Sequence, residues 1–148
     1  MRVAAVVALI LFATPAAADT SVDEAVRAFG LLGTWAIDCK QPASPTNTYV
    51  RVTTPSPGLA LEEHDLGPDS VVNRYSILSA QQLSDSQIAL NVIFQPGREG
   101  EERQRLVLTV RDNTRRTMFN QPEGGKVRVE NGIVLAFGVK TPLLHKCE

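Results

Sequence analysis

The stretch that decides the fold is Gly33-Thr34-Trp35-Ala36-Ile37-Asp38-Cys39, where the hydrophobic periodicity of the chain changes to two. Alternate residues share a face in a β-strand, so Trp35, Ile37 and Cys39 are predicted to lie on one side. The second cysteine, Cys147, stands one residue before the C-terminus. We predict that Cys39 and Cys147 form a disulfide, which would require Cα atoms about 4.4–6.8 Å apart. Such a bridge would close a loop of about 110 residues and contribute about 4–5 kcal/mol of stability.

That bridge would also bring the tail after Pro142 back beside the first strand. We expect Leu143 or Leu144 to pack against the core near Ile37 as a result. A disulfide forms in an oxidising compartment, so the predicted pair bears on localisation as well as on architecture.

Residues 1–18 have the features of a cleavable secretory signal. Arg2 supplies the positive start, residues 3–12 form the apolar stretch, and small residues at 16–18 fit a cleavage site. The apolar stretch is shorter than the roughly 20 residues that a membrane-spanning helix needs, so we expect no integral membrane span. The alternative is an N-terminal anchor that stays uncut. We predict a signal peptide over 1–18 and a periplasmic or secreted domain over 19–148.

The length and net charge of the chain are those of a single domain without a large excess of charge of either sign. Residues 19–148 have the length of a single domain, which we expect to be monomeric. The net charge of −1 argues against a protein that coats nucleic acid or anionic lipid, so we expect no nucleic-acid partner. With one Trp, two Tyr and five Phe, the core must be built mostly from aliphatic side chains.

A helix is predicted at the start of the mature chain. Ser21-Val22-Asp23-Glu24 has the pattern of a capping box, and residues 22, 25, 26 and 29 form an apolar stripe at helical spacing. Gly30 supplies the left-handed residue that ends such a helix. We expect the helix to cover the flank or mouth of a sheet, in preference to a binding role of its own.

From residue 33 onward the pattern is that of short strands separated by turns. Asn131-Gly132 is the strongest hairpin signal in the chain. No second helical segment is long enough for a parallel crossover, so the order must be an antiparallel meander. About eight strands in such a meander close into a barrel or split into a sandwich. A disulfide between the first strand and the tail favours the barrel. The expected strands are residues 33–39, 49–53, 59–64, 71–80, 88–94, 105–111, 115–121, 126–130 and 133–139.

The short helix, the Gly33-Thr34-Trp35 triplet and the meander together resemble the lipocalin-like (calycin) superfamily, and small exported bacterial proteins of that type. In that superfamily a Gly-x-Trp triplet opens the first of eight strands, and the Trp packs across the closed end of the barrel. The second signature, Thr-Asp-Tyr, is replaced here by Arg111-Asp112-Asn113. No Arg stands near the C-terminus to stack on the Trp, and Lys140 is the residue we expect there. The resemblance implies the fold, and barrels of this kind serve unrelated functions.

One cluster of side chains has the composition of a metal site. In Glu62-Glu63-His64-Asp65, Glu62 and His64 would share a face of a strand, and two ligands at that spacing can begin a site. The chain has one other histidine, His145, and the cysteines are expected to pair with each other. We therefore favour a charged strand end that faces water and predict no metal or other cofactor.

A second cluster is rich in arginine. Phosphate or carboxylate recognition would need such groups to converge on one point. Acidic residues in the same segment can offset them, so we favour a solvated hairpin with cross-strand ion pairs. Arg74 stands in the middle of a strand, and the sequence leaves open whether it faces into or out of the barrel. The arginine cluster, to which Arg74 does not belong, consists of Arg103, Arg105, Arg111, Arg115 and Arg116.

No catalytic signature accompanies these clusters. The chain has no Gly-x-Ser-x-Gly elbow, and its Gly124-Gly125-Lys126 segment lacks the rest of a phosphate loop. We therefore expect a protein that is not an enzyme. The leading hypothesis is an exported barrel that binds a small apolar or amphipathic molecule in its interior. The ligand-binding residues we predict are Trp35, Arg74, Tyr75, Ile77, Leu90, Val92, Leu108 and Val110.

The alternative is a protein-interaction module, such as an inhibitor of periplasmic proteases or an envelope accessory protein. Exported metalloprotease inhibitors resemble this chain in size, in their single disulfide and in a Trp in the first strand. They act through a free N-terminal arm. Here two residues, Asp19 and Thr20, precede the predicted helix, which is too short an arm and favours the small-molecule hypothesis.

Overall fold

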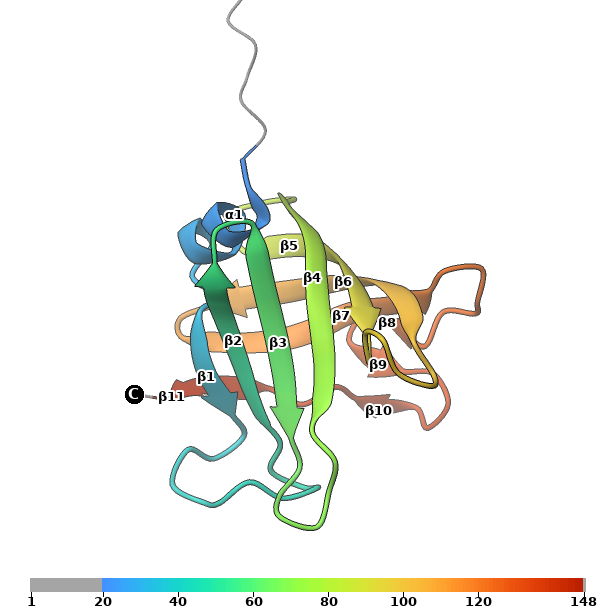
Figure 1. The fold of residues 1–148 in the computed structure, drawn as a ribbon. Coiled ribbons are helices and arrows are strands. Elements are labelled where there is room, and N and C mark those ends of the chain that lie inside the picture. The colour runs from blue at the N-terminus through green and yellow to red at the C-terminus, as the bar shows by residue number, and fades with distance from the viewer. Residues whose placement is uncertain (1–19, 148) are drawn as a thin grey trace, which may run out of the picture.

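The computed structural model describes residues 20–147, so the predicted signal peptide lies outside the described residues. Eight antiparallel strands form a closed barrel in the order β1-β2-β3-β4-β5-β6-β7-β11, because β6 pairs with β7 and β11 pairs with β1 (Figure 1). This confirms the predicted antiparallel meander and the choice of a barrel over a sandwich. The strands are β1 (Gly33–Ala36), β2 (Tyr49–Ser56), β3 (Leu59–Asp65), β4 (Asn73–Gln82), β5 (Gln87–Phe94), β6 (Glu102–Arg111), β7 (Thr114–Pro122) and β11 (Leu144–Cys147).

The closing strand is the C-terminal tail. β11 pairs with β1 on one side, where Lys146 lies opposite Trp35, and with β7 on the other, where Leu144 lies opposite Arg115. Leu144 packs against the core, as predicted, whereas Leu143 is 41% exposed. Ile37 lies one residue beyond the end of β1 and is exposed, so the first strand is shorter than the predicted 33–39.

The segment between β7 and β11 forms a small three-stranded appendage outside the barrel. Its strands are β8 (Val129–Glu130), β9 (Ile133–Val134) and β10 (Val139–Lys140), much shorter than the two strands predicted around the Asn131-Gly132 turn. The turn itself is confirmed, with φ of 51° at Asn131 and 74° at Gly132. β8 pairs with β7 at one position, Asn120 with Val129, because the other end of the same edge of β7 is taken by β11.

The helix α1 (Val22–Ala28) covers one end of the barrel, at the top of Figure 1. The backbone N–H of Ser21 donates to Glu24 Oε2 at 3.3 Å, as the capping box predicts, and Gly30 has a φ of 81°. Val26 and Leu31 are fully buried against the strands. The Gly58 N–H in the β2–β3 turn donates to Asp23 Oδ1 at 2.8 Å, which ties the helix to the rim.

The barrel interior next to α1 is an aliphatic core around one tryptophan. Trp35 is 1% exposed, and its indole Nε1–H donates to the carbonyl of Leu31 at 2.9 Å. Lys146, and not Lys140, lies over the Trp35 ring, with Nζ 5.2 Å from the centroid and 3.2 Å from the Gly30 carbonyl oxygen. Lys140 belongs to β10 in the appendage, where it is exposed. Other buried core residues are Val50, Val52, Ala60, Ile77, Ile88, Leu90, Val92, Leu106 and Leu108.

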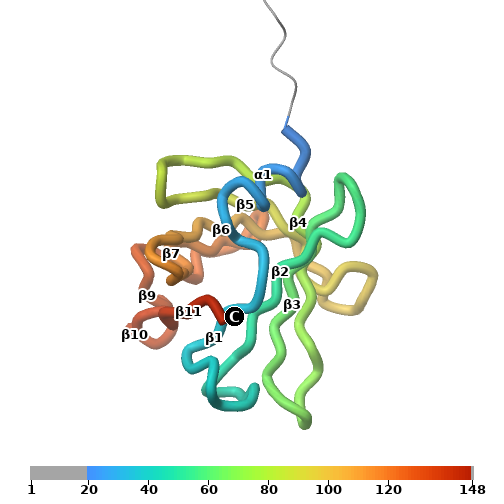
Figure 2. The backbone as a smooth tube through the Cα atoms, turned by 90° about the vertical axis from the view of Figure 1, so that its left-hand side faces the viewer, coloured from blue at the N-terminus to red at the C-terminus, as the bar shows by residue number. Residues whose placement is uncertain are grey.

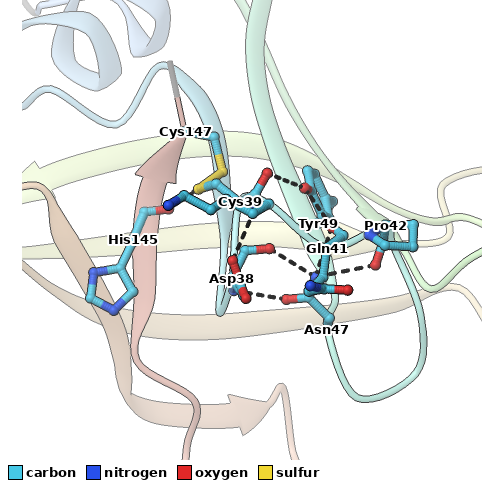
Figure 3. The surroundings of a disulfide bond; sticks show 9 residues. Asp38, Cys39, Gln41, Pro42, Asn47, Tyr49, His145 and Cys147 are labelled. Atoms are coloured by element: carbon cyan, nitrogen blue, oxygen red, sulfur yellow. Dashed lines mark hydrogen bonds between the residues drawn. A yellow bond between two sulfur atoms is a disulfide. The ribbon is translucent and has the colours of Figure 1, made fainter.

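The disulfide between Cys39 and Cys147 is present, with Cα atoms 5.5 Å apart, inside the predicted range. Figure 2 shows the C-terminal segment lying beside β1, as that bond requires. Asn47 organises the adjoining loop, because its Nδ2 donates to the carbonyls of Asp38, Gln41 and Pro42 (Figure 3). The Tyr49 hydroxyl donates to the carbonyls of Cys39 and Gln41 at 3.0 and 2.8 Å. Both the bond and these contacts hold the loop after β1 in place.

Within residues 20–147, no helix has the length and apolarity needed to cross a bilayer.

Candidate binding site at the open end of the barrel

The inward-facing side chains become polar and partly exposed toward the end of the barrel opposite α1. Along β5, Ile88, Leu90 and Val92 are each 1% exposed, whereas Phe94 at the far end is half-buried. The same change occurs along β4, from the buried Ile77 to the half-buried Tyr75. We call this end of the barrel the mouth, and its inner wall carries His64, Tyr75, Phe94 and Glu102.

The base of the mouth holds a buried ion pair. Glu62 on β3 and Arg115 on β7 are 3% and 4% exposed, and Arg115 Nη2 donates to Glu62 Oε2 at 3.0 Å. Nε2 of His64 lies 2.7 Å from the other carboxylate oxygen of Glu62. The Arg115 guanidinium also lies 5.8 Å from the centroid of Trp35, so the charged pair rests on the aliphatic core.

The charge of Glu62 is stabilised by these partners. Burial acts to raise the pKa of Glu62, but the positive charge of Arg115 and the hydrogen bond from His64 outweigh it and lower the pKa to about 2. Glu62 is therefore a carboxylate inside the barrel at any physiological pH. Such a pair costs desolvation, and removing either partner would leave a buried charge uncompensated.

Three rings form a row beside this pair, because Tyr75 is the cross-strand partner of Glu62 and Phe94 is the partner of Tyr75. The ring centroids of His64 and Tyr75 are 4.8 Å apart, and those of Tyr75 and Phe94 are 5.1 Å apart. Such tilted pairs are favourable arrangements of aromatic rings. Burial and the nearby charge of Glu62 raise the pKa of Tyr75 to about 12, so its hydroxyl stays protonated and can donate. Together the rings and the hydroxyl form an amphipathic wall.

A second acidic group lies next to Phe94 on the same wall, because Glu102 is the cross-strand partner of Phe94. Glu102 on β6 accepts two hydrogen bonds from Arg128, at 2.7 and 2.8 Å, and a third from Gln104 Nε2 at 2.6 Å. The hydrogen bonds from Arg128 lower the pKa of Glu102. Asn120 Nδ2 in turn donates to Gln104 Oε1 at 2.8 Å. Each acidic group at the mouth thus has an arginine partner, and the mouth is polar without a large net charge.

The predicted ligand-binding residues fall into three groups. Trp35, Ile77, Leu90, Val92 and Leu108 are buried inside the barrel, where they pack on one another. Tyr75 and Val110 are half-buried and pack against that cluster. Arg74 lies on the outer face, with Nε 3.0 Å from Glu63 Oε1, which settles the direction that the sequence left open.

Arg74 and Tyr75 nevertheless border one cavity. It has a volume of about 280 Å³ and lies between the β3–β4 pair and the β5–β6 loop. Glu62 and Gln95 also line it, and Gln95 Oε1 is a buried acceptor without a protein partner among the described residues. A cavity of this size beside the mouth suits a small molecule better than a chain segment.

Two expectations about charged residues were wrong. Glu62 does not belong to a strand end that faces water, because its direct neighbours across the sheet are Val52 and Tyr75, both on the inner face. Arg115 does not belong to a solvated hairpin, because it is the inward partner of Val110. Within residues 20–147, no group of three or more metal-ligating side chains comes together.

Sequence reasoning therefore missed Glu62, His64, Phe94 and Arg115 as parts of one site. The alternation in β3 groups Glu62 and His64 with Ala60 and opposes them to Leu59 and Leu61. Hydrophobicity alone would turn the two leucines inward, yet Leu59 is 37% exposed. The information that would have located the site is the register of β3 with β2, because it decides which side chains of β3 face the barrel interior.

No protein-family model matches this chain, and neither the curated proteins nor the solved structures include a significant match to it.

Proposed function

We propose that this protein is an exported barrel that binds a small amphipathic molecule at its mouth. The observation that carries the proposal is the row of partly exposed rings, His64, Tyr75 and Phe94, directly beside a buried ion pair. Rings supply flat apolar contact area, and the Tyr75 hydroxyl and the carboxylates supply directional hydrogen bonds. Ligand pockets combine an apolar lining with a few placed polar groups in this way.

The proposal moves the ligand from the deep interior to the mouth. The interior beside α1 is occupied by its own side chains, so an apolar molecule there would have to displace Leu90, Val92 or Leu108. The mouth needs no such displacement, because its rings are partly exposed. The disulfide supports an extracytoplasmic location, since such bonds are typical of proteins from oxidising compartments.

The test begins with native mass spectrometry of the oxidised protein purified from the compartment to which it is exported. We expect an adduct of small mass that is retained under gentle conditions. The Tyr75→Leu variant should lose the adduct, because it removes both the ring and the hydroxyl from the mouth. Tyr49→Phe is the matched control, since Tyr49 bonds to the loop carbonyls outside the barrel and should leave the adduct unchanged.

A second measurement uses 1-anilinonaphthalene-8-sulfonate as an amphipathic probe. We expect the Tyr75→Leu variant to bind the probe about tenfold more weakly, as the loss of one aromatic contact and one hydrogen bond implies. The Tyr49→Phe variant should bind it as the unaltered protein does. Equal binding by all three proteins, together with no adduct, would refute a ligand site at the mouth.

A further inference from the structure

The outer surface of the barrel carries a groove that the proposed ligand site does not use. Two hollows of about 470 and 430 Å³ lie on the outer faces of β5, β6 and β7, and both are lined by Arg105. The first extends toward Leu78 and Glu123, and the second toward Leu83 and Glu130. Arg105 stands between the two hollows, which lie one after the other along β6, and we call them together the groove.

The floor of this groove changes from basic to apolar along β6. Residues two apart on a strand point the same way and stand about 6.6–6.8 Å apart. The first three outward residues of β6 are, in order, Arg103, Arg105 and Val107, since Gln104, Leu106 and Leu108 point inward. Phe119 lies opposite Val107 in the β6–β7 register, and both line the second hollow.

Among the described residues, Arg103 and Arg105 have no acidic partner within 4.0 Å. Arg105 lies between Asn91 and Gln121 in the register of β5, β6 and β7, so both of its cross-strand neighbours are neutral amides. Among residues 20–147, the ion pairs of the arginines involve Arg74, Arg115 and Arg128. Glu123 and Glu130 border the groove without pairing to Arg103 or Arg105 within 4.0 Å in the described structure. The expected cross-strand ion pairs of this hairpin are therefore not formed by these two arginines.

The same outer face bears two more arginines toward the other end of the strands. Arg116 lies opposite Thr109 and Arg111 opposite Thr114, and both alternate with the inward Arg115 and Val110, so they belong to the outer face, where the Nε of Arg116 is itself buried. Four arginines against the two bordering glutamates, Glu123 and Glu130, leave a local excess of positive charge on this face of a chain whose net charge is −1. A groove with this charge attracts an acidic partner.

We propose that this groove binds an extended acidic segment of another protein. A segment with acidic residues at two alternate positions and an apolar residue at the next would place carboxylates on Arg103 and Arg105 and the apolar side chain on Val107 and Phe119. The spacing agrees because an extended peptide has the same two-residue repeat as β6. Carboxylates form strong charge-assisted bonds to guanidinium groups. The apolar floor beside the arginines suits peptide side chains better than the sugar-phosphate backbone of a nucleic acid.

The experiment measures the fluorescence anisotropy of a synthetic peptide of sequence Asp-Ser-Asp-Ser-Leu-Ser, carrying a neutral fluorophore, with the oxidised protein. We expect saturable binding that weakens as salt is added, because the contacts are exposed ion pairs. A peptide of the same residues reordered to Asp-Asp-Ser-Ser-Leu-Ser should bind several times more weakly, since adjacent residues point to opposite faces. Equal binding of the two peptides would refute the spacing argument.

The protein variants separate the groove from general electrostatic attraction. The double variant Arg103→Gln, Arg105→Gln should lower the affinity about fivefold or more, in line with the loss of two exposed ion pairs. The matched control, Arg51→Gln with Arg98→Gln, removes the same charge from the β2 face and the β5–β6 loop and should change the affinity less than about twofold.

Three results would overturn the proposal. One is an equal loss in both double variants, which would indicate attraction to net charge alone. Another is the absence of binding at about 1 mM peptide, a concentration at which even a weak specific site is occupied. The third is tighter binding of duplex DNA or heparin at the same arginines with displacement of the peptide, which would identify the groove as a polyanion surface.

Discussion

Glu62 shows how one residue can keep a charge inside an otherwise aliphatic barrel. Its carboxylate is 3% exposed, yet each of its oxygens has a partner, Arg115 on one side and His64 on the other. Because the folded-state pKa lies near 2 and the ordinary value is 4.5, the folded state favours the ionised form. The stability that follows from this preference is present above pH 4.5 and is lost as the pH falls toward 2.

We therefore predict that the Glu62→Gln variant will have a flatter dependence of unfolding free energy on pH between 4.5 and 2. It should also be less stable by about 3–5 kcal/mol near neutral pH, because Arg115 would keep a buried and uncompensated charge. Denaturant unfolding at a series of pH values measures both effects. The control is Glu63→Gln, whose exposed pair with Arg74 should contribute about 0–1 kcal/mol. Identical pH dependence in the two variants would contradict the assignment of the acid transition to Glu62.

Arg115 allows the reciprocal test. The Arg115→Met variant keeps the length of the stem but removes the charge, so the pKa of Glu62 should rise from its lowered value as burial becomes the dominant influence. We expect the variant to lose stability with increasing pH above about 5, the reverse of the trend in the unaltered protein. Carbon-13 NMR of labelled glutamate side chains would follow the titration directly. An unchanged Glu62 titration would show that His64 alone maintains the ionised form.

At the scale of elements, the helix α1 is held by apolar contacts at one end of the barrel. The loop after it places Leu31 on Trp35, and Leu31 is fully buried there. We predict that Leu31→Ala will cost about 2–5 kcal/mol, because it leaves a cavity at the closed end. Leu59→Ala is the matched control, since Leu59 is 37% exposed, and should cost much less. Thermal unfolding measured by circular dichroism compares the two; equal losses would mean that the loop after α1 contributes little to the core.

The β8–β9 hairpin tests local structure separately from the barrel. Gly132 has a φ of 74°, and a side chain there would approach Met118 Sδ to 3.3 Å. We predict that Gly132→Ala will destabilise the protein by about 1 kcal/mol, as a left-handed residue with a Cβ does. Hydrogen exchange should localise the effect to residues 126–141. A loss of protection throughout the barrel strands would instead show that the appendage is needed for closure.

At the scale of the whole molecule, the disulfide joins the two ends of the barrel strand order. Cys39 follows β1, and Cys147 lies in β11, its neighbour in the closed sheet, 108 positions later in the sequence. We predict that Cys147→Ser will lower the free energy of unfolding by about 4 kcal/mol under oxidising conditions and change little under strong reductant. Melting temperatures of the two proteins with and without reductant provide the measurement. An equal melting temperature in the absence of reductant would indicate that β11 closes the barrel without covalent help.

The sequence by itself determined the elements whose signals are local. The capping box and Gly30 define α1, the period of two in residues 88–94 defines β5, and Asn131-Gly132 defines a hairpin turn, because each depends on neighbours along the chain. The two cysteines were also sufficient to predict the bridge, and the bridge in turn favoured a closed barrel.

The tertiary structure decided which way the strands face and where the charged side chains lie. An alternating strand can present either face to the core, and the choice for β3 follows from its register with β2, which sets Glu62 beside Val52 at the expense of Leu61. The same is true of Arg115. Four other arginines occur in the same stretch of sequence, but only Arg115 is buried among the described residues. The use of the tail as the eighth strand, in place of residues 133–139, likewise depends on pairings between residues far apart in the chain, and no local pattern records them.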